Sequence, residues 1–257
     1  MKIFNSDILI KKTSCNCADL PGHQIPPSVN LFVKVTKGCN AHCAFCSNAG
    51  CQSPTSLFDI EKMIRIIYEL KSKGIIVNRM NITGGEPSVV SPLVVRILDA
   101  IDKEHFDDVH LHLNTNGVTM QAQDLMQHPR WDSISMSLHH YDVNRLSDLY
   151  GCEIPAHLLH FTGVDKQKIN FSCNLIKGYI DNKEEVRKML DLTLDTGIRR
   201  IGFVALMPVN SFCKEHFIDI DDIPFAEIPH VYFTGAKDRG TDCKCSNYLY
   251  NKNLRIL

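Results

Sequence analysis

The sequence has no apolar stretch that could cross a bilayer. Its longest nearly unbroken apolar run, Ile201 to Val209, is too short, and the first ten residues carry Lys2 and Asp7 in place of an apolar signal segment. An excess of one charge is also missing, because 28 Lys and Arg stand against 29 Asp and Glu. General nucleic-acid binding is therefore not expected. These absences favour a soluble cytoplasmic protein without a membrane association.

The unusual feature of the composition is its high number of cysteines. The chain has 257 residues, 44% of them hydrophobic, which is enough for a complete core, and 11 of its residues are cysteines. An odd number of cysteines in a chain of this length, in a reducing compartment, does not suit a disulfide framework. Ligation of a metal or a cluster is the favoured explanation.

Strand and helix patterns alternate along most of the chain. Helical spacing of apolar residues follows Asp59, with Gly74 as a stop; a second helix opens at Ser91, and a third begins at Asn182 and ends at Gly197. Six apolar segments read as strands: 29–36, 77–83, 109–114, 133–138, 169–176 and 201–207. Such alternation predicts an α/β fold of parallel strands, as an open sheet or a barrel, with function at the carboxyl ends of the strands.

The densest cysteine segment follows the first long predicted strand. Cys39, Cys43 and Cys46 form a Cys-x3-Cys-x2-Cys triplet. Three thiolates can hold three corners of a 4Fe-4S cluster and leave one iron open for a substrate. A structural zinc site is the alternative, with His42 or Cys51 as the fourth ligand.

The triplet, with Phe45 just before its last cysteine, resembles the signature of the radical S-adenosylmethionine (radical SAM) enzymes. A second segment, Thr83-Gly-Gly-Glu-Pro87, resembles the motif with which these enzymes bind the amino group of SAM. The resemblance implies cofactor contacts at Phe45, Gly84, Gly85, Glu86 and Pro87. Glycine lets a backbone approach closely, and the Glu86 carboxylate suits an ammonium group.

Weaker matches lie at later strand ends. The resemblance places Ser137 and Asn174 near the ribose and carboxylate of SAM, and Ile176 and Gly178 near the adenine, although Asn174 stands where the family motif usually has glycine. Ordinary strand-end residues are the alternative for all four. His139 and His140 also close a predicted strand, where they could move protons, hold a substrate or simply bond to neighbouring backbone groups.

A second cysteine group lies near the end of the chain. Cys213, Cys243 and Cys245 resemble the auxiliary-cluster region of the SPASM/twitch and molybdenum-cofactor GTP cyclase-like subgroup, which implies a second 4Fe-4S cluster. Free cysteines are the alternative. Cys15 and Cys17 could complete that cluster or be surface thiols.

The resemblance implies a partial (β/α)6 TIM-like barrel over residues 28–208, after an N-terminal extension, 1–27, and before a cluster-binding C-terminal appendage, 209–257. The expected reaction is reductive cleavage of SAM at the 4Fe-4S cluster. This yields a 5′-deoxyadenosyl radical that abstracts hydrogen from a peptide, nucleotide or small metabolite. The expected electron donor is a low-potential protein such as flavodoxin or ferredoxin. The alternatives are a glycyl-radical-enzyme activating enzyme and a non-catalytic zinc-binding interaction module.

Overall fold

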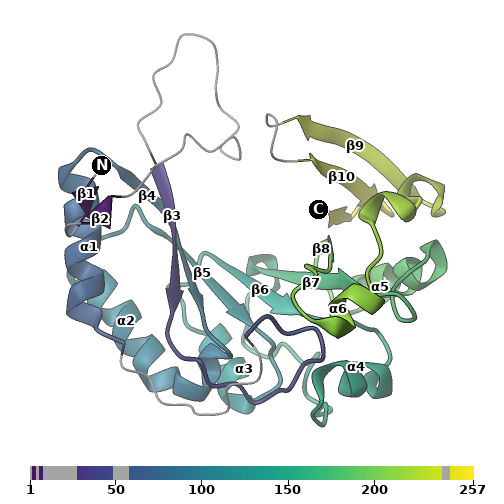
Figure 1. Ribbon diagram of the computed structural model, residues 1–257, viewed down its shortest axis with the longest axis horizontal. Coiled ribbons are helices and arrows are strands. Elements are labelled where there is room, and N and C mark those ends of the chain that lie inside the picture. The colour runs from purple at the N-terminus through teal and green to yellow at the C-terminus, as the bar shows by residue number, and fades with distance from the viewer. Residues whose placement is uncertain (1, 4–5, 8–27, 49–57, 239–243) are drawn as a thin grey trace.

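The computed structural model describes residues 2–3, 6–7, 28–48, 58–238 and 244–257 (Figure 1). Its strands are β1 (Lys2–Ile3), β2 (Ser6–Asp7), β3 (Ser28–Lys34), β4 (Ile76–Thr83), β5 (His110–Thr115), β6 (Ser133–Ser137), β7 (Ile169–Leu175), β8 (Arg200–Ala205), β9 (Val231–Asp238), β10 (Lys244–Tyr250) and β11 (Leu254–Ile256). Its α-helices are α1 (Ile60–Ser72), α2 (Ser91–Lys103), α3 (Met120–Met126), α4 (Val143–Tyr150), α5 (Lys183–Asp195) and α6 (Ser211–Glu215). Short 3-10 helices are η1 (Pro87–Val90), η2 (Lys166–Lys168), η3 (Ile220–Asp222) and η4 (Phe225–Glu227).

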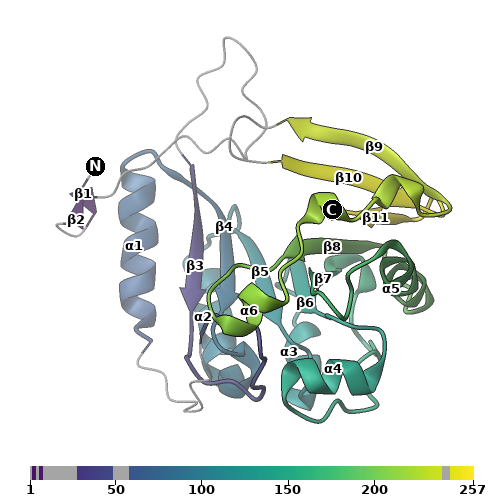
Figure 2. The same cartoon turned by 45° about the vertical axis from the view of Figure 1, so that its right-hand side comes forward.

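Nine of these strands form one sheet in the order β3-β4-β5-β6-β7-β8-β11-β10-β9. Strands β3 to β8 are parallel neighbours in chain order, and helices lie outside them (Figures 1 and 2). The sheet is not closed. The predicted α/β fold with six parallel strands in a partial barrel is therefore confirmed.

Residues after 208 extend this sheet. Strand β11 pairs with β8 in parallel, and β10 pairs with β11 and β9 in antiparallel orientation. The sequence analysis treated residues 209–257 as a C-terminal appendage and did not predict that they continue the sheet. Because a three-residue strand such as β11 buries few side chains, it leaves little periodic signal in the sequence.

The two faces of the parallel sheet differ sharply in polarity. One set of alternating residues, including Leu111, Leu113, Ile134 and Met136, is fully buried under the helices. The opposite face of the same strands carries His, Ser, Asn and Arg side chains. The helices thus bury one apolar face, and the polar face is left for ligands.

Local signals set the ends of the helices as predicted. Asp59 caps α1 through a hydrogen bond from Lys62 N–H, and Asn182 caps α5 by accepting from Glu184 and Glu185 N–H. Gly197 takes a positive φ of 84° just after α5, as expected for a stop. Among the described residues, no helix is long and apolar enough to span a membrane.

Candidate functional site

The loop that follows β3 carries the cysteine triplet and is bound to the end of β4. Gly85 N–H donates to the Thr36 carbonyl at 2.9 Å, and Glu86 N–H donates to the Gly38 carbonyl at 2.8 Å. These bonds continue the pairing of β3 and β4 beyond the strands. The two motifs recognised in the sequence are therefore in direct backbone contact.

The same loop is held from its other side by two helices (Figures 1 and 2). Ala44 N–H donates to the Leu149 carbonyl at the end of α4, at 3.1 Å. Asn210, which caps α6, donates from Nδ2 to the Ala44 carbonyl at 3.0 Å, and the Cys213 thiol lies 3.5 Å from the Phe45 carbonyl. The triplet is thus fixed between three parts of the fold that lie far apart in the sequence.

The cysteine loop leaves no room for a side chain at Gly84 or Gly85. A Cβ on Gly85 would lie 2.1 Å from the Gly38 oxygen, and one on Gly84 would lie 2.8 Å from the Thr36 oxygen. The sequence analysis assigned both glycines to close approach of a ligand. In the structure the close neighbour is the backbone of the cysteine loop itself, so glycine is required for the loop to pack.

Replacing Gly85 with alanine is expected to lower the free energy of unfolding by about 3 kcal/mol, because the clash is with backbone that no rotamer change can move. Gly202→Ala is the control, since its Cβ would have the Leu257 oxygen at 3.7 Å as nearest neighbour. Urea unfolding measures both variants. Equal midpoints for the two would contradict the packing argument.

The three thiols of the triplet influence one another. Burial is the main cause that raises the pKa of Cys43, to about 12, and the charges of Cys39 and Cys46 add to it. Burial also raises the pKa of Cys39, with smaller contributions from Glu86 and Cys46. The thiolate forms of Cys39 and Cys43 are therefore destabilised in the protein alone, and a positive charge between them would stabilise these forms.

Backbone N–H groups of the loop point at two of the three cysteine sulfur atoms, an arrangement that suits cluster ligation. Ala41 N–H lies 3.4 Å from Cys39 Sγ, and Asn48 N–H lies 3.3 Å from Cys46 Sγ. Such donors stabilise ligating thiolates and tune cluster potentials. Three soft sulfur ligands with donors directed at two of them fit a 4Fe-4S cluster. Among the described residues, no three His, Cys, Asp or Glu side chains form a group for a single metal ion.

Glu86 is buried next to the triplet. Its Oε1 accepts from Thr115 Oγ1 at 2.7 Å and from Ser88 N–H at 3.0 Å, and its Oε2 accepts from Asn116 N–H at 2.7 Å. Burial raises the pKa of this carboxyl, while the three donors lower it. The ion pairs among the described residues do not include Glu86. The carboxylate is held in place, and no described residue gives it a positive partner.

A cavity of about 350 Å³ opens beside the triplet, at the carboxyl ends of the strands. That volume lies in the range of small-molecule sites. Its walls bring together several residues named in the sequence analysis and others from the end of β8. They are Cys43, Phe45, Cys46, Ser47, Ser137, His139, Ser172, Asn174, Val204, Ala205, Leu206, Met207 and Val209.

Other predicted residues lie elsewhere. Ile176 is fully buried, and Pro87 is buried at the start of η1, behind Glu86. Gly178, with φ of 85°, lines a different pocket of about 410 Å³. Their cofactor roles stay predictions, as does the second cluster. Of the cysteines predicted for that cluster, Cys213 is buried under the triplet loop, and the Cys245 backbone pairs with Lys237. Cys15, Cys17 and Cys243 lie outside the described residues.

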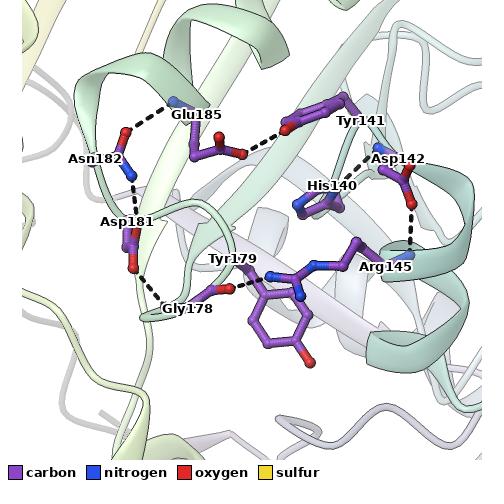
Figure 3. Close-up of a pocket in the computed structure, with 9 residues that line it drawn as sticks. All are labelled: His140, Tyr141, Asp142, Arg145, Gly178, Tyr179, Asp181, Asn182 and Glu185. Carbon is purple, nitrogen blue, oxygen red and sulfur yellow. Dashed lines mark hydrogen bonds between the residues drawn. The ribbon is translucent and has the colours of Figure 1, made fainter.

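The second pocket lies between the turns that follow β6 and β7 (Figure 3). Arg145 stacks over the Tyr179 ring with its guanidinium carbon 4.4 Å from the centroid and donates to the Gly178 carbonyl. Tyr141 donates to Glu185 at 2.6 Å on the opposite wall. The polar groups that line this pocket are thus largely engaged with one another.

Two buried histidines lie on the polar face of the sheet. The sequence analysis left the role of His139 open and did not assign His112 to the site. His139 lines the cavity, and His112 lies deeper on the same face of the sheet, between Ser133 and Ser135. Burial lowers the pKa of both imidazoles to about 3, and the charge of Arg79 contributes at His112. Alternation along the strands indicates that His112 and His139 share a face, but no local sequence pattern indicates that both side chains are buried.

These two histidines predict a loss of stability in acid. An unfolded histidine takes up a proton below about pH 6.5, whereas the folded ones stay neutral to about pH 3, so the free energy of unfolding falls as pH falls between these values. At pH 5 each histidine accounts for a loss of about 2 kcal/mol. Urea unfolding at pH 7 and pH 5 measures it. His139→Asn should lose about 2 kcal/mol less than wild type between these pH values, and an equal loss would contradict the assignment.

Known proteins share sequence and fold with this chain. The sequence profile of the Radical SAM superfamily matches residues 33–211. Curated relatives include a "Probable GTP 3',8-cyclase" of Saccharolobus solfataricus, 26% identical over 204 residues, and one of Archaeoglobus fulgidus, 26% identical over 214 residues. The matches cover 77% and 76% of this chain, and 63% and 65% of those proteins. The chain therefore spans less than two thirds of the length of these relatives.

Solved structures share the fold. Streptococcus suis SuiB bound to S-adenosylmethionine superposes with a TM-score of 0.56 at 18% identity, over 72% of this chain and 42% of SuiB. TYW1 with a lysine-pyruvate adduct gives a TM-score of 0.58 at 14% identity, over 90% of this chain and 81% of TYW1. At these identities the likeness extends to the fold alone.

Proposed function

The chain belongs to the radical SAM superfamily, and from this premise we propose that Cys39, Cys43 and Cys46 hold a 4Fe-4S cluster at which SAM is cleaved reductively. The observation that carries the proposal is a group of three interacting thiols, two of which, Cys43 and Cys46, line a cavity of ligand size. A cluster bound there supplies the electron that breaks a carbon-sulfur bond of SAM. A low-potential donor such as flavodoxin or ferredoxin would supply that electron in turn.

The residues around the triplet would bind and orient SAM. Glu86 offers a buried carboxylate that has no positive partner in the described part of the chain, which suits the ammonium group of the methionine moiety. Ser137 and Asn174 offer polar groups on the cavity wall, and Phe45 offers an apolar surface. The cysteine loop bounds the cavity on one side, and Val204 and Leu206 form an apolar wall on another.

Formation of 5′-deoxyadenosine tests the proposal. The protein is reconstituted with iron and sulfide under anaerobic conditions, reduced chemically and incubated with SAM. Product that depends on bound iron is the expected result. A protein that carries iron but forms no product would overturn the proposed reaction, and a protein that takes up zinc instead of iron would favour the zinc-binding module.

The polar face of the sheet narrows the choice of substrate. Arg79, Arg200 and Arg255 lie on this face, with Arg200 and Arg255 paired in register across β8 and β11. Burial lowers the pKa of Arg79 and of Arg200. Repulsion between guanidinium groups lowers both further, since Arg200 acts on Arg79 and Arg255 acts on Arg200. None of the three belongs to an ion pair among the described residues. Neighbouring guanidinium groups without carboxylates favour an anionic ligand.

The distance between these arginines and the cavity sets a minimum length for a substrate that reaches both. Arg200 lies four residues before Val204, which lines the cavity, and four residues of strand span about 13 Å. Arg79 is fixed against His112 and Ser133 at 2.9 and 3.0 Å, while its buried Nε has no partner among the described residues. We therefore propose an elongated substrate with its reacting carbon near the cavity and a phosphate or carboxylate at the other end. A nucleotide or an acidic peptide fits better than a short metabolite.

A further inference from the structure

His139 joins three parts of the cavity wall. It follows β6 directly, and its Nδ1 accepts a hydrogen bond from Asn174 N–H at 3.0 Å. Its ring meets Phe45 edge to face, with centroids 4.7 Å apart at 83°, and meets Tyr150 in the same way at 5.7 Å and 74°. One buried imidazole therefore links the ends of β6 and β7 to the cysteine loop and α4.

The protonation state of this ring follows from its contacts. Because Nδ1 accepts a backbone hydrogen bond, the hydrogen of the neutral imidazole lies on Nε2. The ring can then neither rotate nor exchange its roles without losing the bond to Asn174. Both residues that it fixes, Phe45 and Asn174, line the cavity beside the triplet.

We infer that His139 is a positioning residue for SAM, which holds Phe45 and the Asn174 backbone in the places where they contact the bound cofactor. This inference rests on the proposed function. Without the ring, Phe45 loses its edge contact and gains rotational freedom, and Asn174 N–H loses its acceptor at the point where β7 ends. SAM would then have to order both groups as it binds, which weakens affinity.

His140 is a matched control beside it. It is 3% exposed against 5% for His139, and its Nδ1 also accepts a backbone hydrogen bond, from Asp142 N–H at 2.9 Å. Its ring, however, faces the second pocket, 4.5 Å from Tyr141 and 6.2 Å from Tyr179 (Figure 3). The two histidines are alike in burial and backbone bonding but differ in the cavity that they face.

The test compares His139→Leu with His140→Leu in protein carrying its reconstituted cluster. Equilibrium binding of SAM, the change in the electron paramagnetic resonance spectrum of the reduced protein on adding SAM, and Tm are measured. His139→Leu is expected to weaken SAM binding about 10-fold and to alter the spectral change, while His140→Leu weakens binding less than about 2-fold at a similar loss of Tm.

Two conservative variants separate the contacts. His139→Asn retains an acceptor for Asn174 N–H without the ring, and His139→Phe retains the ring edge without the acceptor. Each is expected to weaken binding by an intermediate factor, and they carry the test if His139→Leu does not fold. Unchanged affinity in all three His139 variants, or equal weakening in His140→Leu, would overturn the inference. Wild-type protein that forms no 5′-deoxyadenosine would instead overturn the proposed function.

Discussion

Cys43→Ala is expected to reduce 5′-deoxyadenosine formation by more than about 100-fold while the sheet stays folded. Cys43 interacts with the other two thiols and lines the cavity, so its loss removes one of the three cysteines that would hold the proposed cluster. Even removal of groups that merely support metal ligands costs 10- to 100-fold in typical metal sites. Iron content and product are measured after identical anaerobic reconstitution.

Cys152→Ala provides the control for this variant. Cys152 is also partly exposed, and its charge interacts with Cys43, yet it stands outside the triplet at the end of α4. Its backbone carbonyl accepts from Ser147, a bond that alanine retains. Full iron content and activity in Cys152→Ala are expected. Activity of Cys43→Ala at the level of Cys152→Ala would contradict the role of the triplet.

Removing charge from the polar face should weaken anion binding strongly. Arg79→Gln and Arg200→Gln each remove one guanidinium from a group that has no carboxylate partner among the described residues. Loss of a charged hydrogen-bond partner costs about 1.5 to 3 kcal/mol, or roughly 10- to 100-fold in Kd. Calorimetric titration with inorganic pyrophosphate, and separately with glutarate, measures the effect and distinguishes phosphate from carboxylate recognition.

The control for these variants removes a paired arginine. Arg187 lies on α5 between Glu184 and Asp191, in ion pairs of 2.7 Å with both, so Arg187→Gln should leave binding of either anion unchanged. Wild-type affinity should also fall as salt is added, because the attraction is electrostatic. No binding to wild type, or equal binding by Arg200→Gln and Arg187→Gln, would contradict an anion site on this face.

The elements with strong local signals were predictable from the sequence. Six strands and the caps at Asp59 and Asn182 agree with the structure because apolar periodicity and capping act over a few residues. The triplet was also visible, since its spacing is local. In contrast, β11 follows no periodic pattern, and its position depends on pairing with β8.

Contacts between distant segments explain what the sequence could not show. The link between His139 and Phe45 depends on how the end of β6 meets the loop after β3, and these residues are far apart in the chain. Similarly, strand alternation indicates that Arg79 and Arg200 point to one face, but only the order of strands in the sheet brings them near each other. Such neighbours follow from topology rather than from any motif.

The attachment of the cysteine loop to α6 has a consequence for how the protein is made. The bond from Asn210 to Ala44 spans 166 residues, and the contact between Cys213 and Phe45 spans 168. Contacts of such high sequence separation form late in folding, since the entropy of closing a long loop opposes them. During synthesis the loop emerges early and waits for most of the chain before these contacts exist. If the triplet holds the proposed cluster, we expect iron and sulfide to assemble on it only after Asn210 and Cys213 have been synthesised, and the cysteine thiols to be open to oxidation until then.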